Sequence, residues 1–171
     1  MSLSMYQASV PQFLRMLGNL KSILEKAESW AADKKLDPAV LLNMRLAPDM
    51  FPLKRQLQIA TDSAKGCAAR LAGVEIPSYP DTEETFVELK ARLQKTMDFL
   101  ASFAPAQIDG SEDKAITLNF PSMELKFSGR DYLFQFVQPN FYFHLTTAYA
   151  ILRHNGLEIG KMDFIGRPGR F

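Results

Sequence analysis

The sequence predicts a mainly all-α fold, an up-down four-helix bundle with a small β-hairpin inserted before the last long helix. Four stretches repeat apolar residues at spacings of three and four, which is typical of a helix with one buried face. One stretch, residues 115–127, instead alternates apolar and polar residues, which is typical of strands. Because 171 residues suffice for one domain, we expect a single domain over residues 1–171.

The first long helix is predicted from Pro11 to about Ala32. Ser9 is a candidate N-cap, and proline is tolerated in a first turn because its missing N–H would have no partner there. A short helical turn should follow from Asp37 through Asn43. The buried face of the long helix comprises Phe13, Leu17, Leu20, Leu24, Ala27 and Ala31.

The second long helix is predicted to begin near Asp49, with Pro52 in its first turn, and to run to Leu71. Gly73 supplies the signal that ends it. Its apolar face shows the clearest periodicity in the chain and comprises Leu53, Leu57, Ala60, Ala64, Cys67 and Leu71.

A proline-rich linker, residues 76–85, should lead to the third long helix. Asp81 or Thr82 is the expected N-cap, and Glu83 and Glu84 would complement the positive end of the helix dipole. The buried stripe of this helix comprises Phe86, Leu89, Leu93, Met97 and Leu100.

The strands of the hairpin are predicted at residues 115–120 and 123–127. A lone hairpin is marginal in water, so it should pack on the helices. A helical turn at residues 131–137 should precede the last long helix, which is predicted from Pro139 to about His154, with Gly156 as its stop. Residues 165–171 are expected to form a loose tail.

The composition excludes several classes of protein. Twenty basic and nineteen acidic side chains are interleaved, whereas a nucleic-acid-binding protein gathers a basic excess on one face. No apolar run approaches the ~20 residues of a membrane span, and the first residues lack the pattern of a secretory signal. The single cysteine, Cys67, fits a reducing compartment and lies on an apolar stripe. We therefore expect a cytoplasmic protein with a buried, structural thiol.

The two histidines cannot share one metal ion. His144 and His154 are ten residues apart on one predicted helix, which separates them by about 15 Å along its axis. His144 falls on the apolar stripe of that helix and should face the core or a pocket within it. His154 lies in the last turn, where a partly protonated imidazole suits the negative end of the helix dipole.

A polar edge on the second helix gives the candidate site its other residues. Gln58, Asp62 and Lys65 are spaced by four and three, so their side chains can meet. This edge can be a solvated face with a weak surface ion pair, or Gln58 and Asp62 can turn toward His144 across the bundle. The second arrangement predicts a pocket for a small apolar ligand, with Gln58, Asp62 and His144 as its polar groups.

The last helix also carries more aromatic surface than one bundle needs to bury. Phe141, Tyr142, Phe143 and Tyr149 cover more than one of its faces. Small residues between them would allow a second helix to approach closely. This pattern predicts a symmetric homodimer.

Three segments resemble a known family. They are RLAPDMFPLKRQLQIATDSAK at residues 45–65, RLAG at 70–73 and FHLTTAYAILRHNGLEIGKMDF at 143–164. With the order of helices and hairpin, they resemble the DinB/YfiT-like four-helix bundle superfamily, in a branch catalogued only as a domain of unknown function. The resemblance covers nearly the whole chain and implies the bundle fold.

The resemblance also implies an expectation about metal. Many superfamily members bind nickel or zinc through one histidine on the second helix and two on the last, four residues apart. His144 would match the first of that pair, Ala148 would stand at the second, and Gln58 or Asp62 would replace the ligand of the second helix. We therefore expect a non-catalytic or small-ligand-binding homodimer with a lost metal site and no cofactor. The alternative is a divalent-metal-dependent hydrolase or thiol transferase of the DinB/YfiT type.

Overall fold

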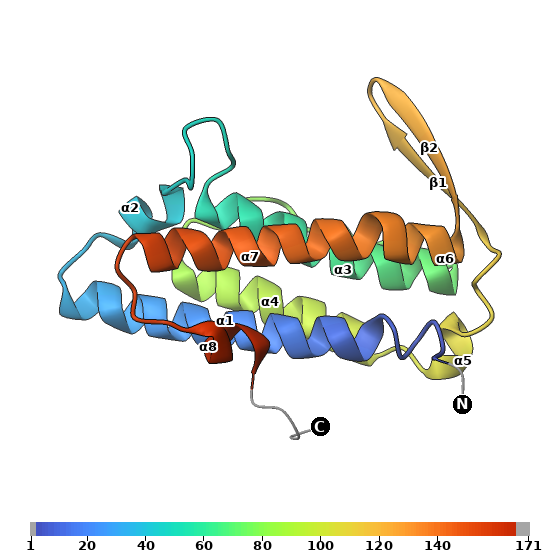
Figure 1. The fold of residues 1–171 in the computed structure, drawn as a ribbon, viewed down its shortest axis with the longest axis horizontal. Coiled ribbons are helices and arrows are strands. Elements are labelled where there is room, and N and C mark those ends of the chain that lie inside the picture. The colour runs from blue at the N-terminus through green and yellow to red at the C-terminus, as the bar shows by residue number, and fades with distance from the viewer. Residues whose placement is uncertain (1–2, 167–171) are drawn as a thin grey trace.

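Four long helices form the body of the protein, and a β-hairpin projects from one end of it (Figure 1). The computed structural model describes residues 3–166. The long helices are α1 (Val10–Asp33), α3 (Leu53–Ala72), α4 (Phe86–Ala101) and α7 (Gln138–His154). The shorter elements are α2 (Pro38–Asn43), α5 (Pro105–Ile108), β1 (Ala115–Phe120), β2 (Met123–Ser128), α6 (Gly129–Asp131), the π-helix η1 (Tyr132–Val137) and α8 (Lys161–Ile165). The predicted bundle with its antiparallel hairpin is confirmed.

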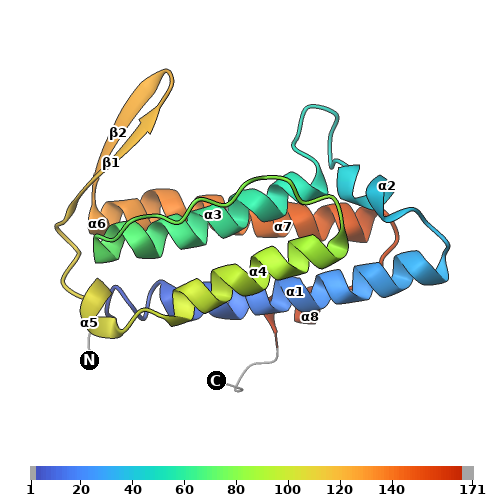
Figure 2. The same ribbon diagram turned by 180° about the vertical axis from the view of Figure 1, so that it is seen from behind.

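The order of helix directions differs from a simple alternation, because α3 and α4 run the same way. The linker between them, residues 74–85, returns along the whole of α3 (Figure 2). Midway along it, the ring of Tyr79 lies 3.9 Å from the Lys65 Nζ, and near its end Glu84 pairs with Lys54 at 2.7 Å. The four long helices therefore run up, down, down and up.

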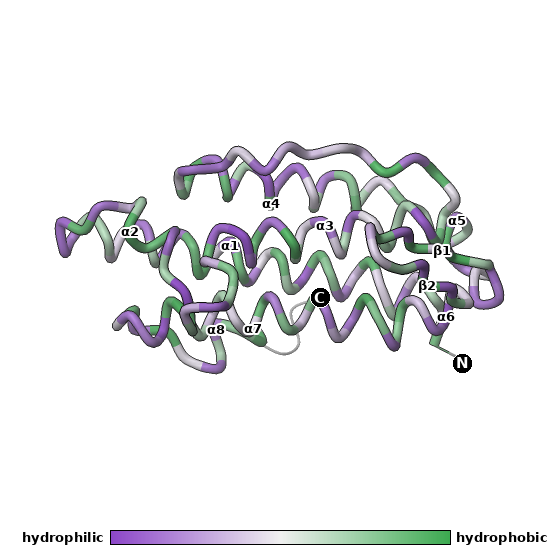
Figure 3. The backbone as a smooth tube through the Cα atoms, turned by 90° about the horizontal axis from the view of Figure 1, so that it is seen from above, coloured by the Kyte–Doolittle hydropathy of each residue, from purple (hydrophilic) through white to green (hydrophobic). Residues whose placement is uncertain are grey.

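The core is built from the apolar faces that the periodicity predicted. Hydrophobic and hydrophilic residues alternate along each long helix (Figure 3), and the apolar side chains of all four meet in one cluster. The rings of Phe13 and Phe141, for example, join α1 to α7 with their centroids 4.8 Å apart. Cys67 is fully buried in this cluster, as expected. Over residues 3–166, no helix combines the length and the apolar character that crossing a bilayer would need.

Two predicted helix starts are wrong. The second long helix begins at Leu53 rather than near Asp49, and Pro52 is its cap residue in an extended conformation. The third begins at Phe86, with Thr85 rather than Asp81 or Thr82 as N-cap. The Thr85 hydroxyl accepts from the backbone N–H of Glu88, and the Glu88 carboxylate accepts from that of Thr85. This reciprocal pair is a capping box, and it fixes the start of α4.

The last helix is longer than predicted. Residues 129–154 form one continuous helical stretch, in which α6, η1 and α7 follow one another without a break. The chain then turns at Gly156, whose φ of +100° suits glycine, so the predicted stop is confirmed. Ile165 belongs to α8 and not to a loose tail. The rest of the expected tail, residues 167–171, lies outside the described residues.

Candidate functional site

The hairpin is held against the bundle by four aromatic rings. Tyr132 and Phe136 of η1 stack with centroids 6.2 Å apart, and Phe127 of β2 lies 5.7 Å from Phe136. Phe120, at the end of β1, lies 6.4 Å from the same ring. In the π-helix a backbone N–H bonds to the carbonyl five residues back, as the bond from Gln138 to Leu133 shows. This wider turn presents Tyr132 and Phe136 together to the hairpin.

A cleft of about 290 Å³ lies between the hairpin, α3 and the start of the last helix. Its volume is at the small end for sites that bind organic molecules. Its walls combine aromatic and aliphatic side chains with polar groups from α3, β1 and α7. The lining residues are Arg55, Ile59, Asp62, Ser63, Arg70, Leu118, Asn119, Phe120, Tyr132, Phe136, Val137 and Asn140.

Arg70 is the half-buried cation of this cleft. Its Nη1 donates to the Tyr132 hydroxyl at 3.0 Å, and within residues 3–166 no carboxylate lies at ion-pair distance from its guanidinium. Gly66, one turn earlier, makes room for it, because a Cβ at Gly66 would lie only 2.6 Å from that Nη1. By contrast, the other arginine of the cleft, Arg55, forms an ion pair with Asp81.

The phenol of Tyr132 is a hydrogen-bond donor facing the same cleft. Burial is the main cause that raises its pKa above the usual range, so the group stays protonated at physiological pH. Its oxygen accepts from Arg70, and among the described residues no acceptor receives its own hydrogen. The remaining N–H groups of Arg70 and the O–H of Tyr132, a side chain only 2% exposed, therefore lie side by side in the wall of the cleft.

Of the three predicted site residues, Asp62 alone lines this cleft. Its Oδ1 pairs with Arg92 Nη2 at 2.9 Å and with Lys65 Nζ at 3.0 Å. The predicted pair with Lys65 is therefore present, but Lys65 is buried and not on a solvated face. Gln58 is buried as well and donates to Glu83 at 2.9 Å.

His144 belongs to a separate polar pair across α3 and α7. Its Nδ1 lies 2.6 Å from the Oε1 of Gln56, whose amide nitrogen donates to the carbonyl of Phe51 at 2.9 Å. Because that second bond fixes the amide oxygen as an acceptor, His144 must carry its hydrogen on Nδ1. Burial, and then the charge of Arg55, lowers its pKa to about 4. The imidazole is thus neutral near pH 7, and the structure brings it together with Gln56 rather than with Gln58 or Asp62.

The residues around His144 do not fit the metal site that the resemblance implies. Its bonded partner is a neutral amide, and a neutral amide with one imidazole is a poor donor set for nickel or zinc. In the part of the chain that the structure describes, no group of three or more histidine, cysteine or acidic side chains could hold a metal ion. His154, the last residue of α7, is exposed at the far end of the helix.

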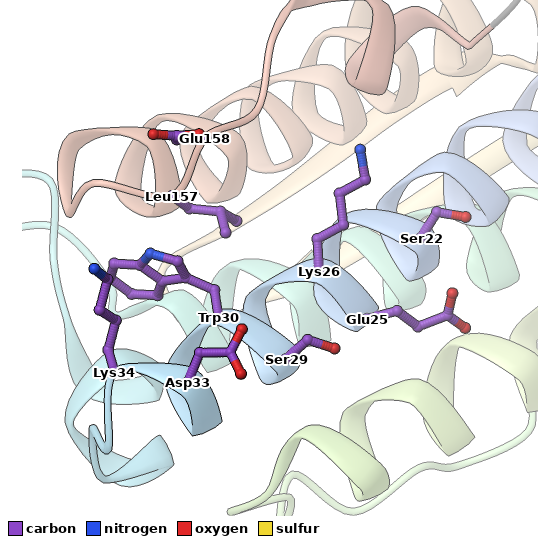
Figure 4. A pocket seen from close by; sticks show the side chains of 9 residues that line it. All are labelled: Ser22, Glu25, Lys26, Ser29, Trp30, Asp33, Lys34, Leu157 and Glu158. Atoms are coloured by element: carbon purple, nitrogen blue, oxygen red, sulfur yellow. The ribbon is translucent and has the colours of Figure 1, made fainter.

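A more open groove of about 690 Å³ runs beside α1 (Figure 4). Positively charged lysines and negatively charged carboxylates share its walls. Lys26 is already paired with Asp163 of α8 at 2.5 Å. Only Trp30 and Leu157 give it apolar surface. Its lining comprises Ser22, Glu25, Lys26, Ser29, Trp30, Asp33, Lys34, Leu157 and Glu158. The cleft under the hairpin, with its aromatic walls and uncompensated arginine, is the better candidate for a binding site.

Sequence reasoning missed Arg70, Tyr132 and Gly66. One signal was available, because a glycine in the middle of a long helix weakens it by roughly 1 kcal/mol relative to alanine and needs a packing reason. Here that reason is the guanidinium four residues later.

The fold and the cleft define a helical bundle that carries a hairpin-covered cleft. Residues 5–165 match the family described as "Domain of unknown function (DUF1993)", and the chain belongs to that family. A crystal structure of a DinB family member protein from Shewanella denitrificans is 42% identical, with a TM-score of 0.87 over 97% of this chain and 94% of that chain. No curated protein matches the sequence.

Proposed function

We propose that this protein is a non-catalytic, small-ligand-binding homodimer whose ligand occupies the cleft under the hairpin. The preformed cleft, with two aromatic rings of the π-helix in its wall, carries this proposal. Short π segments occur frequently at functional sites, because they redirect side chains that a regular helix would hide. Cys67 is a free, buried thiol, which fits the reducing conditions of the cytoplasm, and we propose the cytoplasm as the location of the protein.

The chemistry of the buried groups supports binding rather than catalysis. Burial raises the pKa of the Cys67 thiol well above its usual range, so this sulfur is not a thiolate nucleophile. The partner of His144 is the amide oxygen of Gln56, which is fixed as an acceptor. A neutral amide cannot support a histidine as a general base in the way that a carboxylate does. Ser63 already donates to the carbonyl of Ile59 and accepts from Asn140.

A screen of small aromatic compounds by thermal shift and protein-observed NMR tests the site. We expect compounds that stabilise the wild type to lose their effect in Phe136→Ala, because that ring forms part of the wall. Phe134→Ala, on the same π-helix but 42% exposed, should respond as the wild type does. So should His144→Ala, whose side chain is not part of the lining. Equal responses in all four proteins would place the ligand elsewhere, and no response at all would remove the proposal.

The dimer part of the proposal rests on the outer face of α7. Phe143 is 55% exposed there, and it borders a shallow hollow of about 380 Å³. The exposed Thr146 and the small Ala150 follow it along the same helix. This places a large ring beside a depression, so two copies related by a two-fold axis can each insert Phe143 against the small residues of the other.

Sedimentation velocity over a hundredfold range of concentration measures this association. We expect a dimer for the wild type and a monomer for Phe143→Ser. Phe134→Ser, which removes a similarly exposed ring at the hairpin end, should remain dimeric. A wild type that stays monomeric throughout would contradict the dimer without affecting ligand binding.

A further inference from the structure

The guanidinium of Arg70 is arranged as a binding group rather than as part of the fold. It lines the cleft, and its only bonded partner in the described structure is the Tyr132 hydroxyl. By contrast, the buried Arg92 contacts three carboxylates, those of Asp62, Asp81 and Glu83. Among the described residues, Arg15 is also half-buried without a carboxylate, but its guanidinium donates to the carbonyl of Ile165 and to the side chain of Gln12, whereas that of Arg70 has only the phenol of Tyr132.

The helix beneath Arg70 is shaped to hold that position. The Nη1 atom lies 2.6 Å from the point where a Cβ at position 66 would stand, which is closer than a Cβ tolerates. Glycine weakens a helix interior, yet Gly66 is buried in the middle of α3. The close approach of Arg70 to the helix gives this glycine a purpose, and Arg70 itself lines the cleft.

The charge balance of the cleft selects a monoanion. Arg55 is neutralised by Asp81, and Asp62 is matched by Arg92 and Lys65. Arg70 is left as one uncompensated positive charge beside the O–H of Tyr132. A planar guanidinium binds a carboxylate through two parallel hydrogen bonds, and the phenol can supply a third.

The remaining walls select an apolar body for the ligand. Leu118 and Phe120 of β1 flank the cleft from the hairpin side, and Phe136 and Val137 of η1 complete its apolar surface. We propose that the cleft binds a small aromatic monocarboxylate, with its carboxylate on Arg70 and Tyr132 and its ring against Phe136. This proposal rests on the ligand-binding function proposed above and names the class of ligand.

Isothermal titration with phenylacetate, phenylacetamide and inorganic phosphate tests the class directly. We expect phenylacetate to bind at least tenfold more tightly than the neutral amide, and phosphate not to displace it. Equal affinities for acid and amide would overturn the carboxylate assignment while leaving the ligand-binding function intact. Displacement by phosphate at equal concentration would show an unselective anion site and would also overturn it. If none of the three binds and the aromatic screen is also empty, both proposals fail.

Variants of the arginine and its neighbours show whether this group makes the contact. Arg70→Gln should weaken phenylacetate binding at least tenfold and leave phenylacetamide unchanged. Arg130→Gln, which removes the same charge from an exposed position near the hairpin, should bind as the wild type does. Tyr132→Phe keeps the ring and should weaken only the acid, by a few fold.

Gly66→Ala separates the position of Arg70 from the stability of the protein. The added methyl group displaces the guanidinium, while alanine favours the helix. We expect a melting temperature equal to or above that of the wild type, together with at least fivefold weaker binding of phenylacetate. Unchanged affinity in a correctly folded Gly66→Ala protein would overturn the role assigned to this position.

Discussion

The imidazole of His144 is a buried base that the fold keeps uncharged. Its hydrogen bond with Gln56 satisfies one nitrogen, while burial and the nearby Arg55 both disfavour protonation. In the unfolded chain, the same group would titrate with a pKa near 6.5. The folded protein, with a pKa of about 4, therefore binds fewer protons than the unfolded chain between these two values.

This difference predicts how stability depends on pH. The contribution of His144 is complete above about pH 6.5 and is lost as the pH falls toward 4, because only the unfolded chain gains a proton in that interval. We expect the free energy of unfolding to fall by roughly 2–3 kcal/mol for this reason. Urea denaturation of the wild type and of His144→Asn between pH 7 and pH 4.5 measures it. The variant can keep a bond to Gln56 but should lack this part of the slope; equal slopes would contradict the assigned pKa.

The inward position of His144 could be predicted from the sequence, but its partner could not. Its spacing from Phe141 and Ala148 places it on the buried stripe, and the structure confirms this. Which of Gln56 and Gln58 faces His144 depends on the rotation of α3 about its own axis, and no local pattern determines that rotation. The sequence therefore locates the polar edge at Gln58 and Asp62 and leaves open whether it meets solvent or His144; in the structure these residues contact the linker and α4.

Among the elements, the linker of residues 74–85 is fastened by one arginine of α4. The side chain of Arg92 is only 2% exposed, and it contacts Asp62 of α3 together with Asp81 and Glu83 of the linker. Its Nε also donates to the hydroxyl of Thr61 at 2.7 Å. This group joins three segments at the place where the chain returns along α3.

Replacing Arg92 should therefore destabilise the protein strongly. Arg92→Met keeps the apolar stem but removes one charged contact from each of three carboxylates and the hydrogen bond to Thr61, and we expect a loss of about 3 kcal/mol. Lys90→Met, two residues earlier, removes a more exposed pair with Glu28 and should change stability by less than about 1 kcal/mol. Chemical denaturation monitored by circular dichroism compares the two. Similar losses in both variants would show that the Arg92 contacts contribute no more than a surface ion pair.

The elements themselves were largely predictable, whereas the short ones and the exact starts were not. Strong periodicity located the four long helices, and alternation located both strands. Several residues before Phe86 could cap α4, and the sequence does not show that Thr85, in a capping box with Glu88, is the one that does. Asp81, one of the predicted caps, pairs with Arg92 instead. Helices α5 and α8 are too short for a periodic signal to identify them.

At the scale of the whole molecule, α8 ties the end of the described chain to its first helix. Arg15 and Asn19 of α1 donate to the backbone carbonyls of Ile165 and Phe164, at 2.7 and 2.9 Å. The ring of Phe164 packs against Tyr149 with centroids 5.7 Å apart. The segment thus closes the bundle between α1 and α7 and covers part of the core.

The contribution of this closure can be measured with two variants on the same helix. Phe164→Ala should lower the free energy of unfolding by about 2 kcal/mol, less than for a fully buried ring because Phe164 is half-buried. Met162→Ala, at a position 53% exposed, should lie within about 0.5 kcal/mol of the wild type. Thermal and urea unfolding give both values. A Phe164→Ala protein as stable as the wild type would show that α8 rests on the bundle without supporting it.

Whether the cleft forms depends on the number of residues between the hairpin and α7 as much as on their types, because the π-helix lies in this segment. Each residue of an α-helix turns the chain by about 100°, so removing one residue from η1 would rotate everything before it relative to α7. Such a shortened chain could still form a regular helix and keep the bundle, but Tyr132 would no longer meet Arg70, and the hairpin would point elsewhere. A relative that is one residue shorter in this segment would therefore share the fold without the cleft, even if every side chain of the site were retained.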